Sequence, residues 1–112
     1  MHVEVIREGV PWPLGPALGL TCYRVLQESL TNVMRHSGTD RAVVRLEYRP
    51  DAVVLSVTDQ GHGASAAAGE GSGQVGMRER VAVWGGRLEA GNLPSGGYRV
   101  RAEIPRPEEA GS

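Results

Sequence analysis

The sequence predicts an α/β (α+β) fold: a two-layer sandwich in which helices cover one face of a mixed, mostly antiparallel sheet. Three patterns lead to this prediction. Residues 16–36 repeat like one long amphipathic helix, the strands come in pairs joined by short turns, and the expected order is β-α-β-β-loop-α-β-β. With 112 residues, 40% of them hydrophobic, the chain is large enough for one domain with its own core.

Seven elements are expected along the chain. They are a strand at 2–7, a helix at 16–36, strands at 41–48 and 52–58, a short helix at 77–84, and strands at 87–90 and 98–104. The strand at 52–58 is the most apolar, so we expect it near the centre of the sheet. Trp12, in the connector before the first helix, is expected to cover the core. We expect residues 1–106 to form the domain and 107–112 a polar tail.

The predicted helix at 16–36 presents two rows of side chains. At about 100° per residue, an apolar stripe faces the core; it comprises Leu18, Cys22, Val25, Leu26, Ser29, Leu30, Val33 and Met34. A second row at the edge of this stripe carries Glu28, Asn32, Arg35 and His36. An amide oxygen suits Mg²⁺, and guanidinium and imidazole groups suit phosphate. Taken alone, such a row is more often a solvated edge than a site.

A first glycine-rich stretch begins where the apolar strand ends. Asp59 is followed at once by Gly61 and Gly63. A carboxylate in this position can accept a hydrogen bond from the exocyclic amine of adenine, while the glycines let a ligand approach the backbone. The same pattern is also typical of an ordinary turn after a strand.

A second glycine-rich stretch, Gly71, Gly73 and Gly76, precedes the helix that we expect from Met77. The free N–H groups at the start of a helix suit phosphate. The G-x-G-x-x-G spacing alone is weak evidence. A dinucleotide-binding version follows the first strand of a parallel βαβ unit. Here the motif follows a long loop and leads to antiparallel strands, which argues against a Rossmann site.

The composition excludes several classes of protein. All 12 basic residues are Arg, so the Lys of a Walker-type P-loop and the strand Lys of a Ser/Thr-type protein kinase are both missing. A net charge of -1 and a pI of about 6.3 give no electrostatic case for nucleic acid or a membrane surface. The single Cys22 excludes an internal disulfide, and no Cys and His residues stand at zinc spacing.

No signal peptide and no spanning segment are expected, because charged residues interrupt the start and no apolar run approaches the roughly 20 residues that a spanning helix needs. The domain is therefore expected to be cytoplasmic, although a parent protein could be anchored in a membrane.

Taken together and in this order, the three stretches resemble the ATP-binding domain of sensor histidine kinases, with the nitrate-sensor and DesK-type subfamily nearest. E-S-L-T-N-V-M-R-H-S resembles the N box, D-Q-G-H-G the first glycine box, and G-S-G-Q-V-G-M-R-E-R-V the second. G-G-R-L-E-A-G and P-S-G-G-Y-R-V-R-A-E-I-P resemble the closing hairpin. The resemblance covers nearly the whole chain and implies the Bergerat (GHKL) ATP-binding fold.

The resemblance also implies roles for the motif residues. Asn32 would coordinate a Mg²⁺ ion that bridges the phosphates, and Glu28 would help to orient the attacking group. Asp59 would bind the adenine amine. The other ATP-binding residues that it implies are Arg35, His36, Gly61, Gly63, Gly71, Gly73, Val75, Gly76 and Met77. Of these, Gly71, Gly73 and Gly76 would form the hinges of a lid over the ATP. Two residues depart from the family pattern: Gln74 replaces an apolar residue of this lid, and Tyr98 replaces a Thr that many members carry.

The implied reaction is Mg-ATP-dependent phosphoryl transfer to a His on a dimerisation domain, and then to a response regulator. None of His2, His36 and His62 stands in the expected acceptor pattern, so we expect the acceptor outside this chain and the chain itself to be a monomer. Two alternatives stay open: a Ser/Thr kinase of the anti-sigma type, and a degenerate nucleotide-binding module. The M-R-E-R segment and the short lid favour the histidine kinase, and the intact Glu28, Asn32 and Asp59 argue against a degenerate module.

Overall fold

The computed structural model describes residues 2–36, 41–59, 72–94 and 96–107, without the side chains of 33–36 and 72–75. The seven elements occur in the predicted order. They are β1 (His2–Gly9), α1 (Gly15–His36), β2 (Arg41–Arg49), β3 (Ala52–Asp59), α2 (Ser72–Val83), β4 (Arg87–Asn92) and β5 (Tyr98–Pro105). None of the described helices has the length and apolar character needed to cross a membrane.

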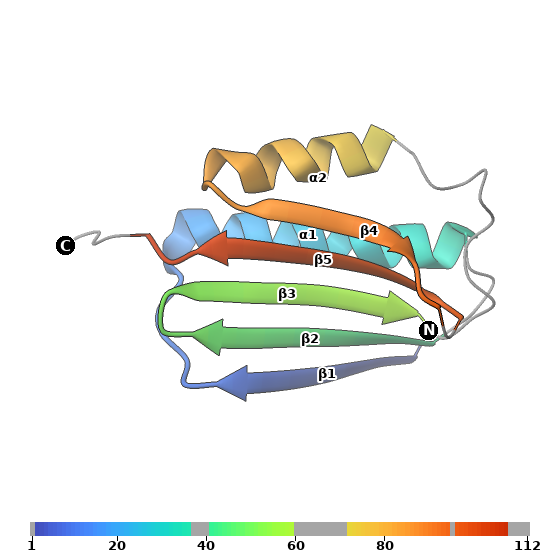
Figure 1. Ribbon diagram of the computed structural model, residues 1–112, viewed down its shortest axis with the longest axis horizontal. Coiled ribbons are helices and arrows are strands. Elements are labelled where there is room, and N and C mark those ends of the chain that lie inside the picture. The colour runs from blue at the N-terminus through green and yellow to red at the C-terminus, as the bar shows by residue number, and fades with distance from the viewer. Residues whose placement is uncertain (1, 37–40, 60–71, 95, 108–112) are drawn as a thin grey trace.

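The strands form one sheet in the order β1-β2-β3-β5-β4. β2 pairs with β3, β3 with β5 and β4 with β5 in antiparallel ladders, whereas β1 pairs with β2 in parallel. A parallel pair needs a long crossover, and α1 supplies it. Both helices lie on the same face of the sheet (Figure 1). The predicted fold class, with a mixed and mostly antiparallel sheet, is therefore confirmed, and β3 stands at the centre of the sheet as expected.

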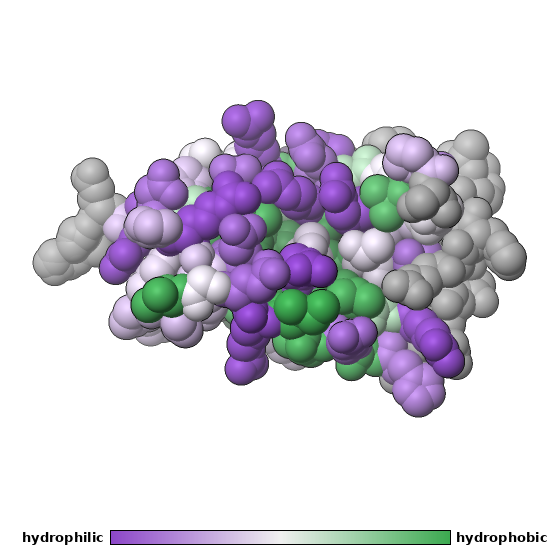
Figure 2. Space-filling model, turned by 60° about the horizontal axis from the view of Figure 1, so that its bottom comes forward, coloured by the Kyte–Doolittle hydropathy of each residue, from purple (hydrophilic) through white to green (hydrophobic). Residues whose placement is uncertain are grey.

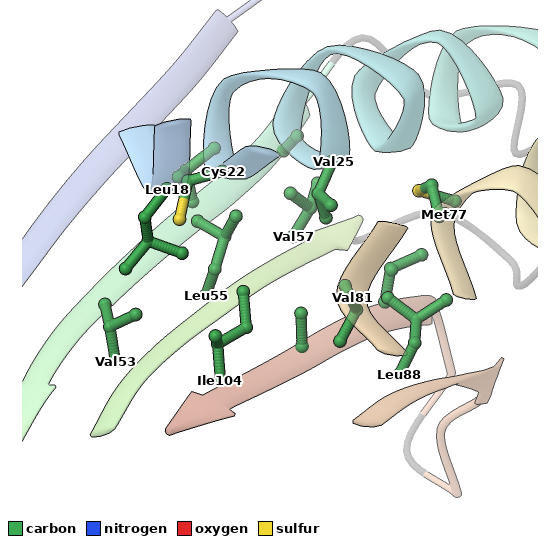
Figure 3. Close-up of a cluster of buried hydrophobic side chains, with 14 of the residues drawn as sticks. Leu18, Cys22, Val25, Val53, Leu55, Val57, Met77, Val81, Leu88 and Ile104 are labelled. Carbon is green, nitrogen blue, oxygen red and sulfur yellow. The ribbon is translucent and has the colours of Figure 1, made fainter. Parts of the chain in front are cut away.

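The core lies between the sheet and the two helices, and α1 buries the predicted stripe in it. Leu18, Cys22, Val25 and Ser29 are buried, and Leu26 and Leu30 pack against the same cluster. The sheet contributes alternate residues of β3 and β5, and α2 contributes Met77 and Val81 (Figure 3). The remaining predicted stripe residues, Val33 and Met34, have side chains outside the description.

Trp12 covers one end of this core, as predicted. Its indole Nε1 donates a hydrogen bond of 2.8 Å to the carbonyl of Arg49, and its ring meets Tyr48 edge-on with 5.8 Å between centroids. The guanidinium of Arg106 lies 4.6 Å from the centroid of the same ring. The connector before α1 and the end of β5 are therefore joined to the β2–β3 turn by one aromatic side chain.

The start of α2 was predicted wrongly. The helix begins at Ser72 and ends at Val83, whereas the sequence predicted residues 77–84. Gly73 and Gly76 have low helix propensity, each costing about 1 kcal/mol relative to Ala. Met77 and Val81, four residues apart and fully buried, fasten this helix to the core. Tertiary packing thus outweighs local propensity, and the helix begins within the glycine-rich stretch. The other boundaries differ from prediction by two residues or fewer.

Leu18 and Leu20 make a matched test of the core, since they stand on opposite faces of one helix with 1% and 52% of their surface exposed. Leu18→Ala is expected to lower the free energy of unfolding by about 2–5 kcal/mol, because it leaves a cavity against the sheet. Leu20→Ala should change it by no more than about 0.5 kcal/mol. Urea denaturation measures both, and equal losses in the two variants would contradict the assigned faces.

Candidate functional site

Four segments meet at one end of the molecule. α1 and β3 both finish there, α2 begins there, and the loop between β4 and β5 lies beside them (Figure 1). The segments that carry the described motif residues come together at this end, although they are far apart in the sequence. The predicted site therefore corresponds to one place in the fold.

Asp59 is the last residue of β3 and is buried, with 1% of its surface exposed. By strand alternation its side chain shares the helix-covered face with Val57 and Leu55. Its neighbour across the ladder is Ala42, near the start of β2. A carboxylate in such a position is costly to desolvate, so its burial at the end of the central strand points to a binding role.

Gly97, in the loop before β5, presses against Asp59. Its φ is +95°, and a Cβ added there would stand 2.5 Å from the backbone oxygen of Asp59 and 3.8 Å from Oδ1. Hydrogen bonds from Leu93 N to Gly97 O (2.9 Å) and from Gly96 N to Leu93 O (3.0 Å) close this loop. Only glycine fits both the backbone conformation and the close approach. This contact was not predicted, although the Gly96-Gly97 pair before β5 is a signal for it.

Glu28 and Asn32 are half-buried on the flank of α1 that faces α2. The orientation of this flank is fixed by Trp84 of α2, whose Nε1 donates a 3.0 Å hydrogen bond to Thr21 Oγ1. Glu28 and Asn32 follow Thr21 by seven and eleven residues, which returns them to the same row of the helix. The predicted second row at the edge of the buried stripe is confirmed for these two residues.

Ser29 and Met77 fix the middle of α2 against α1. Both are fully buried, and Ser29 Oγ lies 3.6 Å from Met77 Sδ as well as donating a 2.7 Å hydrogen bond to the carbonyl of Val25. Ser29 lies in the predicted stripe, but its contact with Met77 was not predicted. The four-residue spacing of Met77 and Val81 was the available signal.

The other predicted site residues lie outside the described residues or at the ends of the two helices. Gly61, Gly63 and Gly71 lie outside the described residues. Arg35 and His36 belong to the last turn of α1, and Gly73, Val75 and Gly76 to the first turns of α2. Of these, only Gly76 has a described environment, and it is half-buried. Tyr98, which departs from the family pattern, is buried in the core at the start of β5.

The described residues suit a metal ion that takes most of its ligands from bound phosphate groups and water. Among the residues that the structure describes, no three His, Cys, Asp or Glu side chains gather to hold a metal ion. Mg²⁺ commonly takes few protein ligands and completes its shell with phosphates and water. A single amide oxygen from Asn32 fits that kind of site.

A hollow of about 400 Å³ also lies at the starts of β1 and β2. Its walls are His2, Val3, Glu4, Arg41, Ala42 and Val43. Neither Glu28, Asn32 nor Asp59 lines it, but Ala42 is the ladder neighbour of Asp59, so the hollow adjoins the place where the motif residues meet.

Residues 18–108 match the sequence profile of the histidine kinase-, DNA gyrase B- and HSP90-like ATPase family. The chain belongs to this family. The profile begins in the first turn of α1 and ends after β5, so it includes the described motif residues and the core that positions them.

Within this family, the chain is similar to sensor histidine kinases. The chain is 30% identical over 108 residues to the sensor histidine kinase YxjM and 34% identical over 101 residues to the sensor histidine kinase LnrJ, both of Bacillus subtilis. These matches cover 94% and 90% of this chain but only 26% and 25% of the relatives. The chain thus spans about a quarter of their length. These relatives belong to the NarL-type, DesK-like group that the motifs resemble, so the predicted kinship is confirmed.

Solved structures agree on the fold. The blue-light-activated histidine kinase of Erythrobacter litoralis matches 99% of this chain and 37% of its own, with a TM-score of 0.68 at 25% identity. The histidine kinase AdeS of Acinetobacter baumannii matches 94% of this chain and 54% of its own, with a TM-score of 0.73 at 15% identity. The Bergerat (GHKL) fold is confirmed, and the chain is an ATP-binding catalytic domain of the sensor histidine kinase type.

Gly97 offers a test of how firmly the loop holds Asp59. Gly97→Ala is expected to lower the free energy of unfolding by about 1–3 kcal/mol, because the new methyl group would be strained by the positive φ and would meet the Asp59 carbonyl. Gly91→Ala is the control, since a Cβ there meets nothing within 4 Å. Thermal denaturation followed by circular dichroism compares them. A Gly97→Ala variant as stable as the parent would show that the contact is loose.

Proposed function

We propose that this domain binds Mg-ATP at the end where α1, β3, α2 and the β4–β5 loop meet. It would present the γ-phosphoryl group to a His on a dimerisation domain outside this chain, from which the group passes to a response regulator in the cytoplasm. Family membership supports ATP binding. The single observation that carries the location is the buried Asp59 carboxylate, held against Gly97 at the end of the central strand.

Asp59 is proposed to select the base. A carboxylate only accepts hydrogen bonds, so it suits the exocyclic amine of adenine. Guanine presents a carbonyl oxygen at the corresponding position, and two acceptors facing each other in a buried site repel. Gly61 and Gly63 are proposed to shape the base pocket beside it.

Asn32 is proposed to hold the metal, and Glu28 to orient the attacking group. Mg²⁺ would neutralise charge on the phosphates and bridge them to the protein. Glu28 stands one turn before Asn32 on the same half-buried row, so a carboxylate and an amide face the same side. Because the chain has no Lys, the remaining charge neutralisation would fall on Arg35 and His36 and on backbone N–H groups.

The true start of α2 changes which backbone groups are proposed for the phosphates. The first N–H groups of a helix have no partner within it. With α2 beginning at Ser72, these groups belong to residues 72–75. We therefore assign phosphate contacts to the backbone around Gly73 and Val75, with Gly71 and Gly76 as hinges of the lid. Met77, buried against Ser29 at the middle of α2, would act by fixing this helix on α1.

Replacing Asp59 tests the base pocket. Asp59→Asn is expected to weaken ATP binding by about 1–3 kcal/mol and to narrow the preference over GTP, because the amide can present a donor to the adenine amine. Calorimetric titration of the 112-residue chain with a non-hydrolysable ATP analogue, and with its GTP counterpart, measures both effects. Asp51→Asn, in the exposed β2–β3 turn, is the matched control. Unchanged ATP affinity in Asp59→Asn would refute the assignment.

Replacing Asn32 tests the metal role. Asn32→Ala is expected to reduce the affinity for the ATP analogue strongly when Mg²⁺ is present and little when it is absent. In this variant the affinities measured with and without Mg²⁺ should therefore be similar. Asn92→Ala, on the exposed end of β4, controls for loss of an amide elsewhere. Equal losses with and without Mg²⁺ would exclude a metal role for Asn32. If the parent chain binds neither nucleotide under either condition, the degenerate-module alternative is favoured instead.

A further inference from the structure

The strand β1 lies at one edge of the sheet with nearly all of its residues exposed. It pairs with β2 on one side, and no other described strand lies on its second side. Every residue of β1 is exposed except Ile6, which is half-buried. An uncovered edge strand of eight residues presents a row of backbone N–H and C=O groups to which another strand can bind.

The helix-side face of β1 is apolar where no helix covers it. Val3 pairs with Ala42 and Val5 with Val44, two core residues, so both valines point to the helix side. They nevertheless remain 40% and 55% exposed. Figure 2, which turns the β1 edge toward the viewer, shows hydrophobic surface bordered by hydrophilic residues.

The flank of α1 on the side of β1 and β2 also exposes an apolar side chain. Thr21 faces α2 through its hydrogen bond with Trp84. Tyr23, two residues later, is turned by about 200° and therefore looks the opposite way, toward the side of β1 and β2. Its side chain is 57% exposed. Apolar surface exposed on both layers at one edge is typical of an interface.

The sequence of β1 is self-complementary in an antiparallel register that pairs His2 to Glu8, nearly the whole strand. Suppose that two copies of β1 pair antiparallel about a twofold axis perpendicular to the sheet. Residues that face the helices must then lie opposite residues that face the helices, and this requires one residue to lie directly opposite its own copy. With the axis at Val5, the valine faces its own copy, Val3 faces Arg7, and His2 faces Glu8. An axis at Glu4 sets two glutamates opposite each other, and an axis at Ile6 sets Glu4 opposite Glu8. Of these registers, only the one centred on Val5 avoids like charges while pairing apolar and opposite-charge residues.

We propose that two copies of this chain associate through β1, antiparallel and centred on Val5, to form one continuous sheet with all helices on the same face. This interface would cover the valines of both copies and place each Arg7 stem over the Val3 of the other. Glu8, which pairs with Arg45 at 2.9 Å, would meet the His2 of the second copy on the outer face. The surface contains none of Glu28, Asn32 and Asp59, and the proposal replaces the sequence-based expectation of a monomer.

A symmetric cross-link tests the register. Residues directly opposite in an antiparallel pair have Cα atoms about 4.5–5.5 Å apart, which suits a disulfide. Val5→Cys is therefore expected to give a disulfide-linked dimer under mild oxidation of the folded protein. In this register Val3 and its own copy stand four positions apart along the strands, roughly 13 Å, so Val3→Cys should not cross-link. Val10→Cys, exposed and outside β1, measures random collision, and the native Cys22 is buried.

Sedimentation equilibrium of the unmodified chain gives a second measurement. The weight-average mass is expected to rise from 11.9 kDa toward twice that value with increasing concentration. Val5→Lys should shift this self-association to higher concentration by setting two ammonium groups opposite each other, while Val10→Lys should not. Circular dichroism confirms that each variant is folded, which is expected because both valines are exposed. A chain that stays at 11.9 kDa at all concentrations, or equal cross-linking of all three cysteine variants, would overturn the proposal.

Discussion

The packing of α1 along β3 is the contact on which the rest of the arrangement depends. The stripe of Leu18, Cys22, Val25 and Ser29 lies on the most buried strand of the sheet. This contact sets the rotation of α1 about its axis, and the rotation turns the row of Glu28 and Asn32 toward α2. Burial also raises the pKa of the Cys22 thiol, as expected for a small side chain desolvated within this stripe. The site at the far end of α1 therefore follows from how its middle is packed.

Local patterns in the sequence were enough for the element order, the buried face of α1 and the central place of β3. Each of these depends on residues close together in the chain, so the repeat of apolar positions carries the information. The start of α2 was missed because Gly73 and Gly76 disfavour a helix locally, whereas Met77 and Val81 stabilise it by contacts with distant residues. The parallel pairing of β1 with β2 was also beyond reach, since no local pattern tells a strand which neighbour it will take.

For the site, the sequence supplied the residue types and the structure supplied their convergence. Asp59 and Asn32 were identified by motif, and the structure brings the ends of their two elements to one end of the molecule. The close contact between Gly97 and Asp59 was not predicted, because it joins residues 38 positions apart through the backbone and not through side-chain chemistry. Motif reading finds the groups that touch a ligand more readily than the glycine that holds one of them in place.

The order of the strands has a consequence for how the chain folds. β2 with β3, and β4 with β5, form hairpins of neighbouring segments. The ladder between β3 and β5 joins the two hairpins, and it pairs residues far apart in the chain, such as Thr58 with Arg99 and Ala52 with Pro105. Hairpins form quickly, and closing such long separations is slow, so docking of the two preformed hairpins is expected to set the folding rate. Asp59 and Gly97 stand on opposite sides of this seam. A ligand bound there would hold the two halves together and favour the docked state.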